Sequence, residues 1–146
     1  MELIILSGRS GSGKSTALHQ LEDEGFYAID NLPVSLLPAL VRELSQSPLK
    51  VHKQVAVCID ARNSQDELAR FKSLCDEVKK HAHLRIVFLD AGDDKLIKRF
   101  SETRRRHPLT TDSLPLADAI KLESTLLEPI VVEASLAIDS SDMMQT

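Results

Sequence analysis

A glycine-rich octapeptide near the amino terminus restricts the fold of this chain more than any other feature. It spans Gly8–Ser15, reads GRSGSGKS, and has the spacing G-x-x-x-x-G-K-S. The apolar run Leu3–Leu6 precedes it, and a segment of helical periodicity, Ser15–Glu24, follows it. This order of strand, loop and helix is the context in which such a loop cradles phosphate groups. The flanking elements therefore favour a phosphate loop over an ordinary turn rich in glycine and serine.

The residue types in this loop each suit a nucleotide. The glycines let the backbone curl so that its N–H groups point inward at an anion. The helix that begins near Lys14 adds the positive end of its dipole. We predict that Lys14 neutralises β- and γ-phosphate charge as a catalytic residue and that the Ser15 hydroxyl binds Mg²⁺. The expected cofactors are ATP or GTP with Mg²⁺, and the expected nucleotide-binding residues here are Gly8, Arg9, Ser10, Gly11, Ser12, Gly13, Lys14 and Ser15.

Five short apolar runs alternate with segments of helical period along the chain. Uninterrupted apolar runs are typical of strands buried on both faces of a parallel sheet. The order predicts an α/β fold of the kinase-like P-loop NTPase class, a doubly wound parallel five-stranded sheet with helices on both faces. The predicted strands are Leu3–Leu6, Phe26–Ile29, Val55–Ile59, Leu84–Leu89 and Leu136–Ile138, and the predicted helices are Ser15–Glu24, Pro33–Leu44, Ser64–Lys80, Asp93–Arg105 and Leu116–Leu127.

Length and composition limit the class of protein. A chain of 146 residues suits one nucleotide-binding domain over residues 1–146. No apolar run has the length of a membrane span, which requires about 18 residues or more. The only cysteines, Cys58 and Cys75, lack the neighbouring Cys and His residues of a zinc site or a disulfide framework. We therefore expect a protein of the reducing cytoplasm with no membrane partner.

Positive charge is concentrated in one segment. The net charge of −4 argues against a dedicated nucleic-acid binder, yet Lys95–His107 holds six basic residues and one acidic residue. Such a segment suits a lid whose arginines, among them Arg99 and those at 104–106, close over a phosphate group. A solvated helix face and a contact with an RNA backbone are the alternatives.

Acidic residues directly follow the apolar runs and are candidate magnesium ligands. The carboxyl ends of parallel strands gather at one edge of the sheet, where a phosphate loop would also lie. Asp60 is preferred over Asp90, because the third strand usually neighbours the phosphate-loop strand in kinase-like P-loop proteins. Asp90 is expected to cap the turn that follows it. Asp30 either binds a substrate or nucleotide hydroxyl or forms an Asx turn.

Six stretches spread over the chain carry a more specific resemblance: SGRSGSGKS, ALHQLEDEGFYAIDNLP, IDARN, FLDA, TRRRHPL and LLEP. With these stretches the chain resembles the amino-terminal domain of the RapZ or YvcJ-type P-loop nucleotide-binding family. The resemblance implies binding of ATP and GTP with slow hydrolysis at the phosphate loop. It also implies a guanine-nucleotide contact by Asp60, Ala61, Arg62 and Asn63.

The resemblance also implies a cellular role. Some members of the family are RNase adapters, which present a small regulatory RNA to an endoribonuclease and so control synthesis of the enzyme that makes glucosamine-6-phosphate. Members are about twice this length and carry their main RNA-binding part in a carboxy-terminal domain that we expect to be absent here. A homo-oligomer is expected for the full-length protein. The alternative function is a small-molecule or nucleotide kinase of the P-loop class, which shares the topology and the lid arginines.

Overall fold

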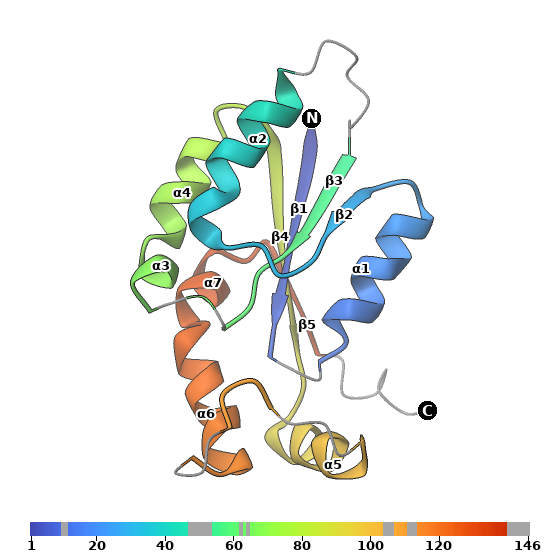
Figure 1. Cartoon of the computed structure of the whole chain (residues 1–146), viewed down its shortest axis with the longest axis vertical. Coiled ribbons are helices and arrows are strands. Elements are labelled where there is room, and N and C mark those ends of the chain that lie inside the picture. Colours follow the sequence, from blue (N-terminus) through green and yellow to red (C-terminus); the bar gives the residue numbers. More distant parts are fainter. Residues whose placement is uncertain are drawn as a thin grey trace.

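A five-stranded parallel sheet forms the centre of the molecule (Figure 1). The computed structural model describes residues 1–9, 12–46, 54–61, 63, 65–103, 107–110 and 114–139. The strand order is β2-β3-β1-β4-β5, and each neighbouring pair is parallel. The strands are β1 (Glu2–Gly8), β2 (Tyr27–Ile29), β3 (Gln54–Cys58), β4 (His83–Asp90) and β5 (Leu136–Asp139). The predicted doubly wound parallel sheet is confirmed, including the position of β3 beside β1.

Helices cover both faces of this sheet. Helix α1 lies alone against one face, and α2, α4 and α7 lie against the other (Figure 1). The helices are α1 (Lys14–Asp23), α2 (Leu37–Ser45), α3 (Gln65–Ala69), α4 (Phe71–Val78), α5 (Asp93–Thr103), α6 (Leu116–Leu126) and α7 (Glu128–Glu133), and a 3-10 helix, η1 (Val34–Leu36), precedes α2.

The central strand β3 is largely apolar because it is buried from both sides. In β3, Val55 and Val57 belong to the core under α2, α4 and α7, whereas Ala56 and Cys58 belong to the core under α1. Alternate residues of a strand point to opposite faces, so a strand with two covered faces has no polar period. Phe71, which is completely buried at the start of α4, is one of the largest side chains of the major core.

Two helices predicted as single elements are divided. Residues 65–78 form α3 and α4, which meet at Arg70, where φ is −89° and ψ is 4°. The segment predicted from Pro33 begins as η1 and continues as α2, with Pro38 in the first turn of α2. A proline is tolerated at that place because the N–H that it lacks would have no partner within the helix.

Helix α7 corrects the sequence prediction. The sequence places the last helix before Pro129, but the structure adds α7 with Pro129 in its first turn. The same rule that accounts for Pro38 applies here, since a proline can begin a helix as well as end one. Helix α7 contributes the fully buried Ile130 to the major core. None of the helices in the described residues is long and apolar enough to span a membrane.

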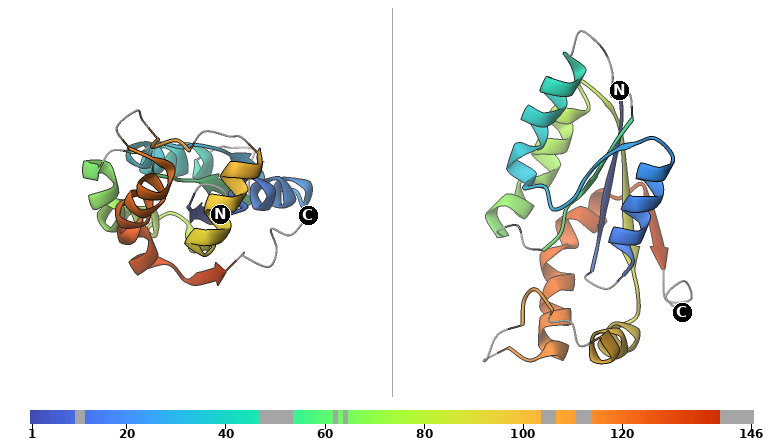
Figure 2. Two further views of the ribbon diagram at one scale, coloured as in Figure 1. Left: turned by 90° about the horizontal axis from the view of Figure 1, so that it is seen from below. Right: turned by 45° about the vertical axis from the view of Figure 1, so that its right-hand side comes forward.

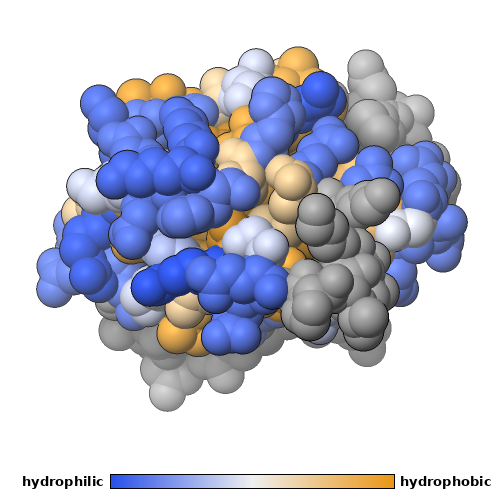
Figure 3. Space-filling model, turned by 90° about the horizontal axis from the view of Figure 1, so that it is seen from above, coloured by the Kyte–Doolittle hydropathy of each residue, from blue (hydrophilic) through white to orange (hydrophobic). Residues whose placement is uncertain are grey.

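Helices α5 and α6 lie beyond the carboxyl end of β1, as the two views of Figure 2 show. They form a small core of their own, centred on Leu96 and Ile120 and packed around Ala91. The opposite edge of the sheet, where β1 begins, presents mainly hydrophilic side chains over its described surface (Figure 3). The predicted lid segment is described only in part, because residues 104–106 lie outside the described ranges.

Candidate functional site at the carboxyl edge of the sheet

Gly8 ends β1 at a point where no side chain fits. It pairs in register with Leu89 of β4, and a Cβ atom on Gly8 would lie 2.2 Å from the Leu89 carbonyl oxygen. It would also lie 2.8 Å from the Ser12 hydroxyl oxygen. The first glycine of the motif is therefore required by the close approach of two backbones and one buried hydroxyl.

Lys14 turns back across the loop from the first position of α1. Its Nζ donates a hydrogen bond of 2.7 Å to the carbonyl oxygen of Gly8, so the two ends of the loop are joined by a cation. Gly13 caps α1 with a φ of 97°, in the left-handed region that favours glycine. Because Gly13 has no side chain, the first turn of α1 has no side-chain cap. Ser15 lies exposed in that first turn.

The end of β3 brings a carboxylate to the same edge. Asp60 is buried. The preceding residue, Ile59, is joined to β1 by two hydrogen bonds. Its N–H donates to the Leu6 oxygen at 2.9 Å, and its carbonyl oxygen accepts the Ser7 hydroxyl at 2.6 Å. Asp30 lies at the end of β2 and is exposed. The predicted convergence of strand-end acids at one edge is therefore what the topology produces.

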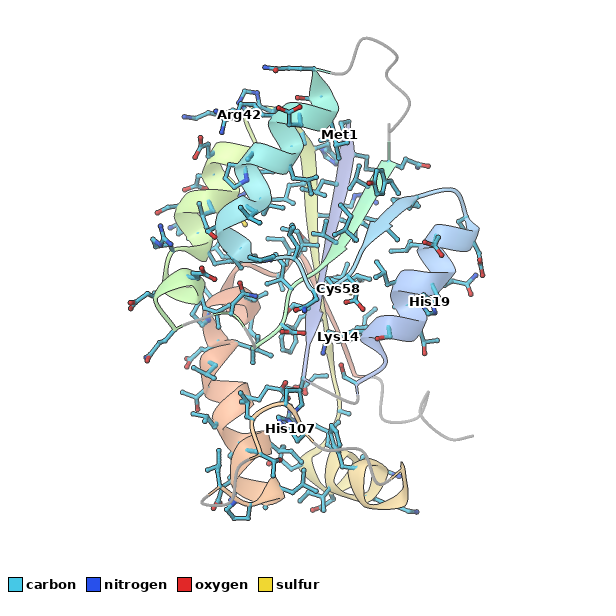
Figure 4. The ribbon with its side chains drawn as sticks, in the orientation of Figure 1. Met1, Lys14, His19, Arg42, Cys58 and His107 are labelled. Atoms are coloured by element: carbon cyan, nitrogen blue, oxygen red, sulfur yellow. The ribbon has the colours of Figure 1, made fainter. Side chains whose placement is uncertain are left out.

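Lys14, Asp30 and Asp60 all act electrostatically on Cys58, the last residue of β3. Burial, together with the Asp30 and Asp60 carboxylates and against the opposing charge of Lys14, raises the pKa of the Cys58 thiol to about 12. Figure 4 labels Lys14 and Cys58 in the same part of the molecule, toward the carboxyl end of β1. A thiol with this pKa stays protonated at neutral pH, so Cys58 is a packing residue rather than a nucleophile.

Arg9 belongs to the predicted nucleotide-binding set, but its guanidinium is engaged within the protein. Its Nε donates to Asp90 Oδ1 at 2.8 Å, and its terminal nitrogens donate to Asp93 Oδ1 and to the Ala91 carbonyl oxygen. Burial alone would lower the pKa of Arg9, but the hydrogen bonds and charges of Asp93 and Asp90 raise it above its ordinary value. The arginine thus ties the phosphate loop to the end of β4 and the start of α5.

Asp90 is the acid that the sequence analysis assigned to a turn. Its Oδ1 accepts the Ala91 N–H at 2.8 Å as well as the Arg9 bond. Its carboxylate therefore caps the turn, as the sequence analysis expected, and also binds Arg9. The magnesium role of Asp60 stays a prediction; this residue follows β3, on the opposite side of β1 from β4.

Asn63 bridges two loops. Its Oδ1 accepts the Val34 N–H at 2.8 Å, and its Nδ2 donates to the Asp60 carbonyl oxygen at 3.1 Å. Ala61 beside it is buried. The remaining predicted site residues, Ser10, Gly11 and Arg62, lie outside the described residues.

A cavity of about 630 Å³ opens beside the phosphate loop and is lined in part by Arg9 of that loop. Its described lining comes from the ends of β4 and β5 and from α6 and α7, and includes Phe88, Asp90 and Glu128. Gly13, Lys14 and Ser15 are not among the lining residues. Among the described residues of the motif, only Arg9 therefore borders the cavity.

A buried histidine and glutamate join the segment between α5 and α6 to α6 itself. His107 Nε2 lies 3.1 Å from Glu123 Oε1, and both side chains are almost fully buried. The Leu109 N–H donates to His107 Nδ1, so the proton of a neutral imidazole is on Nε2. The ring also packs against Phe100, at 5.1 Å between centroids (Figure 4 labels His107). The sequence analysis assigned no role to His107, because the glutamate that binds it is 16 residues away.

Comparison with known families decides the relationship that the motifs suggested. The RapZ-like N-terminal domain family matches the chain over residues 1–146. The chain belongs to this family. It is 57% identical over 144 residues to a nucleotide-binding protein of Pseudomonas paraeruginosa and 56% identical to one of Pseudomonas aeruginosa strain PAO1. Each alignment covers 98% of the chain and 50% of the relative, so this RapZ-like chain spans about half the length of these curated relatives.

Solved structures share the fold at low sequence identity. A sugar kinase from Janibacter sp. HTCC2649 aligns with a TM-score of 0.59 and 15% identity over 99% of this chain and 90% of its own. A shikimate kinase from Bacteroides thetaiotaomicron aligns with a TM-score of 0.56 and 16% identity over 96% and 87%. These likenesses show a P-loop kinase-like fold for this RapZ-like domain.

Proposed function

We propose that this RapZ-like domain binds ATP or GTP with Mg²⁺ at the loop between β1 and α1. The single observation that carries this proposal is the position of Lys14, whose ammonium lies 2.7 Å from the Gly8 oxygen at the amino end of α1. A phosphate group at this helix end would meet backbone N–H groups, the helix dipole and a lysine together. The names of the curated relatives, which are nucleotide-binding proteins, support the same proposal.

The oxygen atoms at this edge suit a magnesium ion held mainly by the nucleotide. Mg²⁺ commonly takes one or two protein oxygen ligands together with substrate phosphates and water. Ser15 and Asp60 supply one hydroxyl and one carboxylate, and the described residues contain no cluster of three or more acidic, His or Cys side chains. When bound, the ion would neutralise phosphate charge. Ser15 and Asp60 would hold it, and Lys14 would bind the phosphate oxygens.

We propose slow hydrolysis rather than efficient turnover. Lys14 stabilises negative charge, but a protonated lysine cannot accept a proton from an attacking water. The Asp60–Asn63 segment, including Ala61 and Arg62, is proposed to lie beside the nucleotide because the family resemblance places its nucleotide contact there.

Calorimetric titration of the chain with ATP and with GTP in Mg²⁺ tests the proposal. The Lys14→Ala variant is expected to lose affinity for both nucleotides by about tenfold or more, since it removes a charged hydrogen bond to phosphate. Lys72→Ala is the matched control, because it removes an exposed lysine of α4. Unchanged affinity in Lys14→Ala would refute the assignment.

A kinase is the second candidate, and Asp30 is the observation that favours it. This exposed carboxylate lies at the end of β2, one strand beyond Asp60, where it could accept a hydrogen bond from an acceptor hydroxyl. The fold shared with a sugar kinase and a shikimate kinase agrees with such a role. A screen of hydroxylated acceptors with labelled ATP decides between the candidates, since stoichiometric transfer supports the kinase and release of free phosphate supports the NTPase.

For the full-length protein we propose the RNase adapter role that the family resemblance implies. In this role it would act as a cytoplasmic homo-oligomer that binds a small regulatory RNA and an endoribonuclease and modulates glucosamine-6-phosphate synthesis. The support within this chain is the basic segment, in which Lys95 and Lys98 lie exposed on α5. Any RNA binding through this segment should weaken steeply as salt rises. A gel-shift titration at low salt tests it, and absence of binding would confine the role to the other half of the protein.

A further inference from the structure

Asn63 occupies a position that its assignment to a guanine contact does not explain. Its side-chain oxygen accepts the N–H of the fully buried Val34, and its side-chain nitrogen donates to the Asp60 carbonyl oxygen. The backbone N–H of Asn63 also donates to that same Asp60 oxygen at 3.3 Å. Both ends of the amide therefore bond to the protein's own backbone, on two different segments.

The bond to Val34 fastens the loop after β2 to the loop after β3. A second bond joins the same two segments, from the Leu32 N–H to the Cys58 oxygen at 3.0 Å. Between β2 and Leu32 the chain turns through Asn31, whose φ of 54° is in the left-handed region. Two hydrogen bonds thus join the segments that follow β2 and β3, which carry Asp30 and Asp60.

The geometry points to Asn63 as a positioning residue, not as a reader of the nucleotide base. We propose that it fixes the Asp60 backbone, and with it the Asp60 carboxylate, relative to the loop that carries Asp30. This inference rests on the proposed nucleotide function. It predicts that Asn63 supports metal-nucleotide binding equally for ATP and GTP, because those two ligands present the same phosphates and differ only in the base.

The Asn63→Ala variant separates the two roles by the ratio of two affinities. If Asn63 positions Asp60, the affinities for ATP and for GTP should both fall about tenfold in Mg²⁺, as is usual when a partner of a metal ligand is removed. The ratio of the two affinities should stay unchanged. In excess EDTA the loss should be smaller for both nucleotides, because the residue acts through Asp60. Ser35→Ala is the control, since Ser35 is the neighbour of Val34 and its exposed side chain contacts Glu67 of α3, at 3.5 Å, and not Asp60 or Asn63.

Two results would overturn the proposal. A loss of GTP affinity with ATP affinity intact would show that Asn63 reads the base, and unchanged affinity for both would show that its bonds do not matter to the site. If Asn63→Ala does not fold, Asn63→Asp keeps an acceptor for the Val34 N–H and removes the donor to Asp60, and the same ratio applies. Failure of the proposed function itself would be visible earlier, as absent nucleotide binding by the wild-type chain or an inert Lys14→Ala variant.

Discussion

Replacement of Gly8 by alanine tests the close approach of β1 and β4. The added methyl carbon would lie 2.2 Å from the Leu89 carbonyl oxygen, which belongs to the backbone and cannot rotate away. Carbon and carbonyl oxygen atoms in contact lie roughly 3.3–3.6 Å apart, so the strands must separate locally by about 1 Å. The φ of 154° at Gly8 adds backbone strain for any residue with a Cβ.

The expected loss of stability follows from these two effects. Forcing a methyl group into packed structure costs about 1–3 kcal/mol, and one weakened ladder hydrogen bond adds about 1 kcal/mol. Gly8→Ala should therefore lower the free energy of unfolding by about 3 kcal/mol. In a chain of this size that corresponds to a fall in Tm of roughly 10 °C.

Thermal and urea unfolding, followed by circular dichroism, measure the effect against two other glycines. A Cβ on Gly92 meets no atom within 4 Å, and the same holds at Gly25, where φ is 101°. Gly92→Ala should change stability by less than about 1 kcal/mol, whereas Gly25→Ala should cost about 1 kcal/mol from its conformation alone. If Gly8→Ala is as stable as Gly92→Ala, the steric reasoning about the phosphate loop is wrong.

Two further predictions concern buried groups, one at the phosphate loop and two cysteines of the core. Arg9→Ala should lower the free energy of unfolding by about 1–3 kcal/mol in urea titrations, and Arg9→Lys should not restore it, because an ammonium cannot reproduce the three-way fork. The pKa values of Cys58 and Cys75 are raised from 9.0 to about 12, so above pH 9 the unfolded chain loses thiol protons that the folded chain keeps. Stability should then fall between pH 9 and 12 by roughly 1 kcal/mol per thiol per pH unit, and a Cys58→Ala, Cys75→Ala double variant should show a shallower fall.

The sequence predicted the sheet well because a strand that is buried on both faces appears as an uninterrupted apolar run. Each of the five strands appears as an apolar run, since helices cover both sides of each central strand. Helix boundaries were less predictable where a proline occurs. Pro129 has the same lack of an N–H whether it ends one helix or begins the next, and only the packing of Ile130 into the core shows that α7 forms.

In the candidate site, too, some features could be predicted from local sequence and others depended on the tertiary structure. The strand–loop–helix order around Gly8–Ser15 is local, so the spacing of glycine, lysine and serine alone predicts a phosphate loop. The position of β3 beside β1 was predicted correctly, but β4 lies on the other side of β1, so strand order alone does not separate Asp60 from Asp90. The bonds of Asp90 to Arg9 and to the Ala91 N–H are what distinguish the two acids, and they appear only in the tertiary structure. The side-chain partners of Arg9 could not be predicted from the sequence, because its position inside the motif does not indicate which distant carboxylates it meets.

What the sequence by itself determined is the set of local elements: apolar strands, a glycine loop and the helix that starts at its lysine. Tertiary structure decided which distant residues those elements meet. Arg9 binds Asp90 across 81 residues, and Asn63 binds Val34 across 29. Periodicity reports only which face of an element is buried, whereas a hydrogen bond between loops depends on the strand order that brings them to one edge.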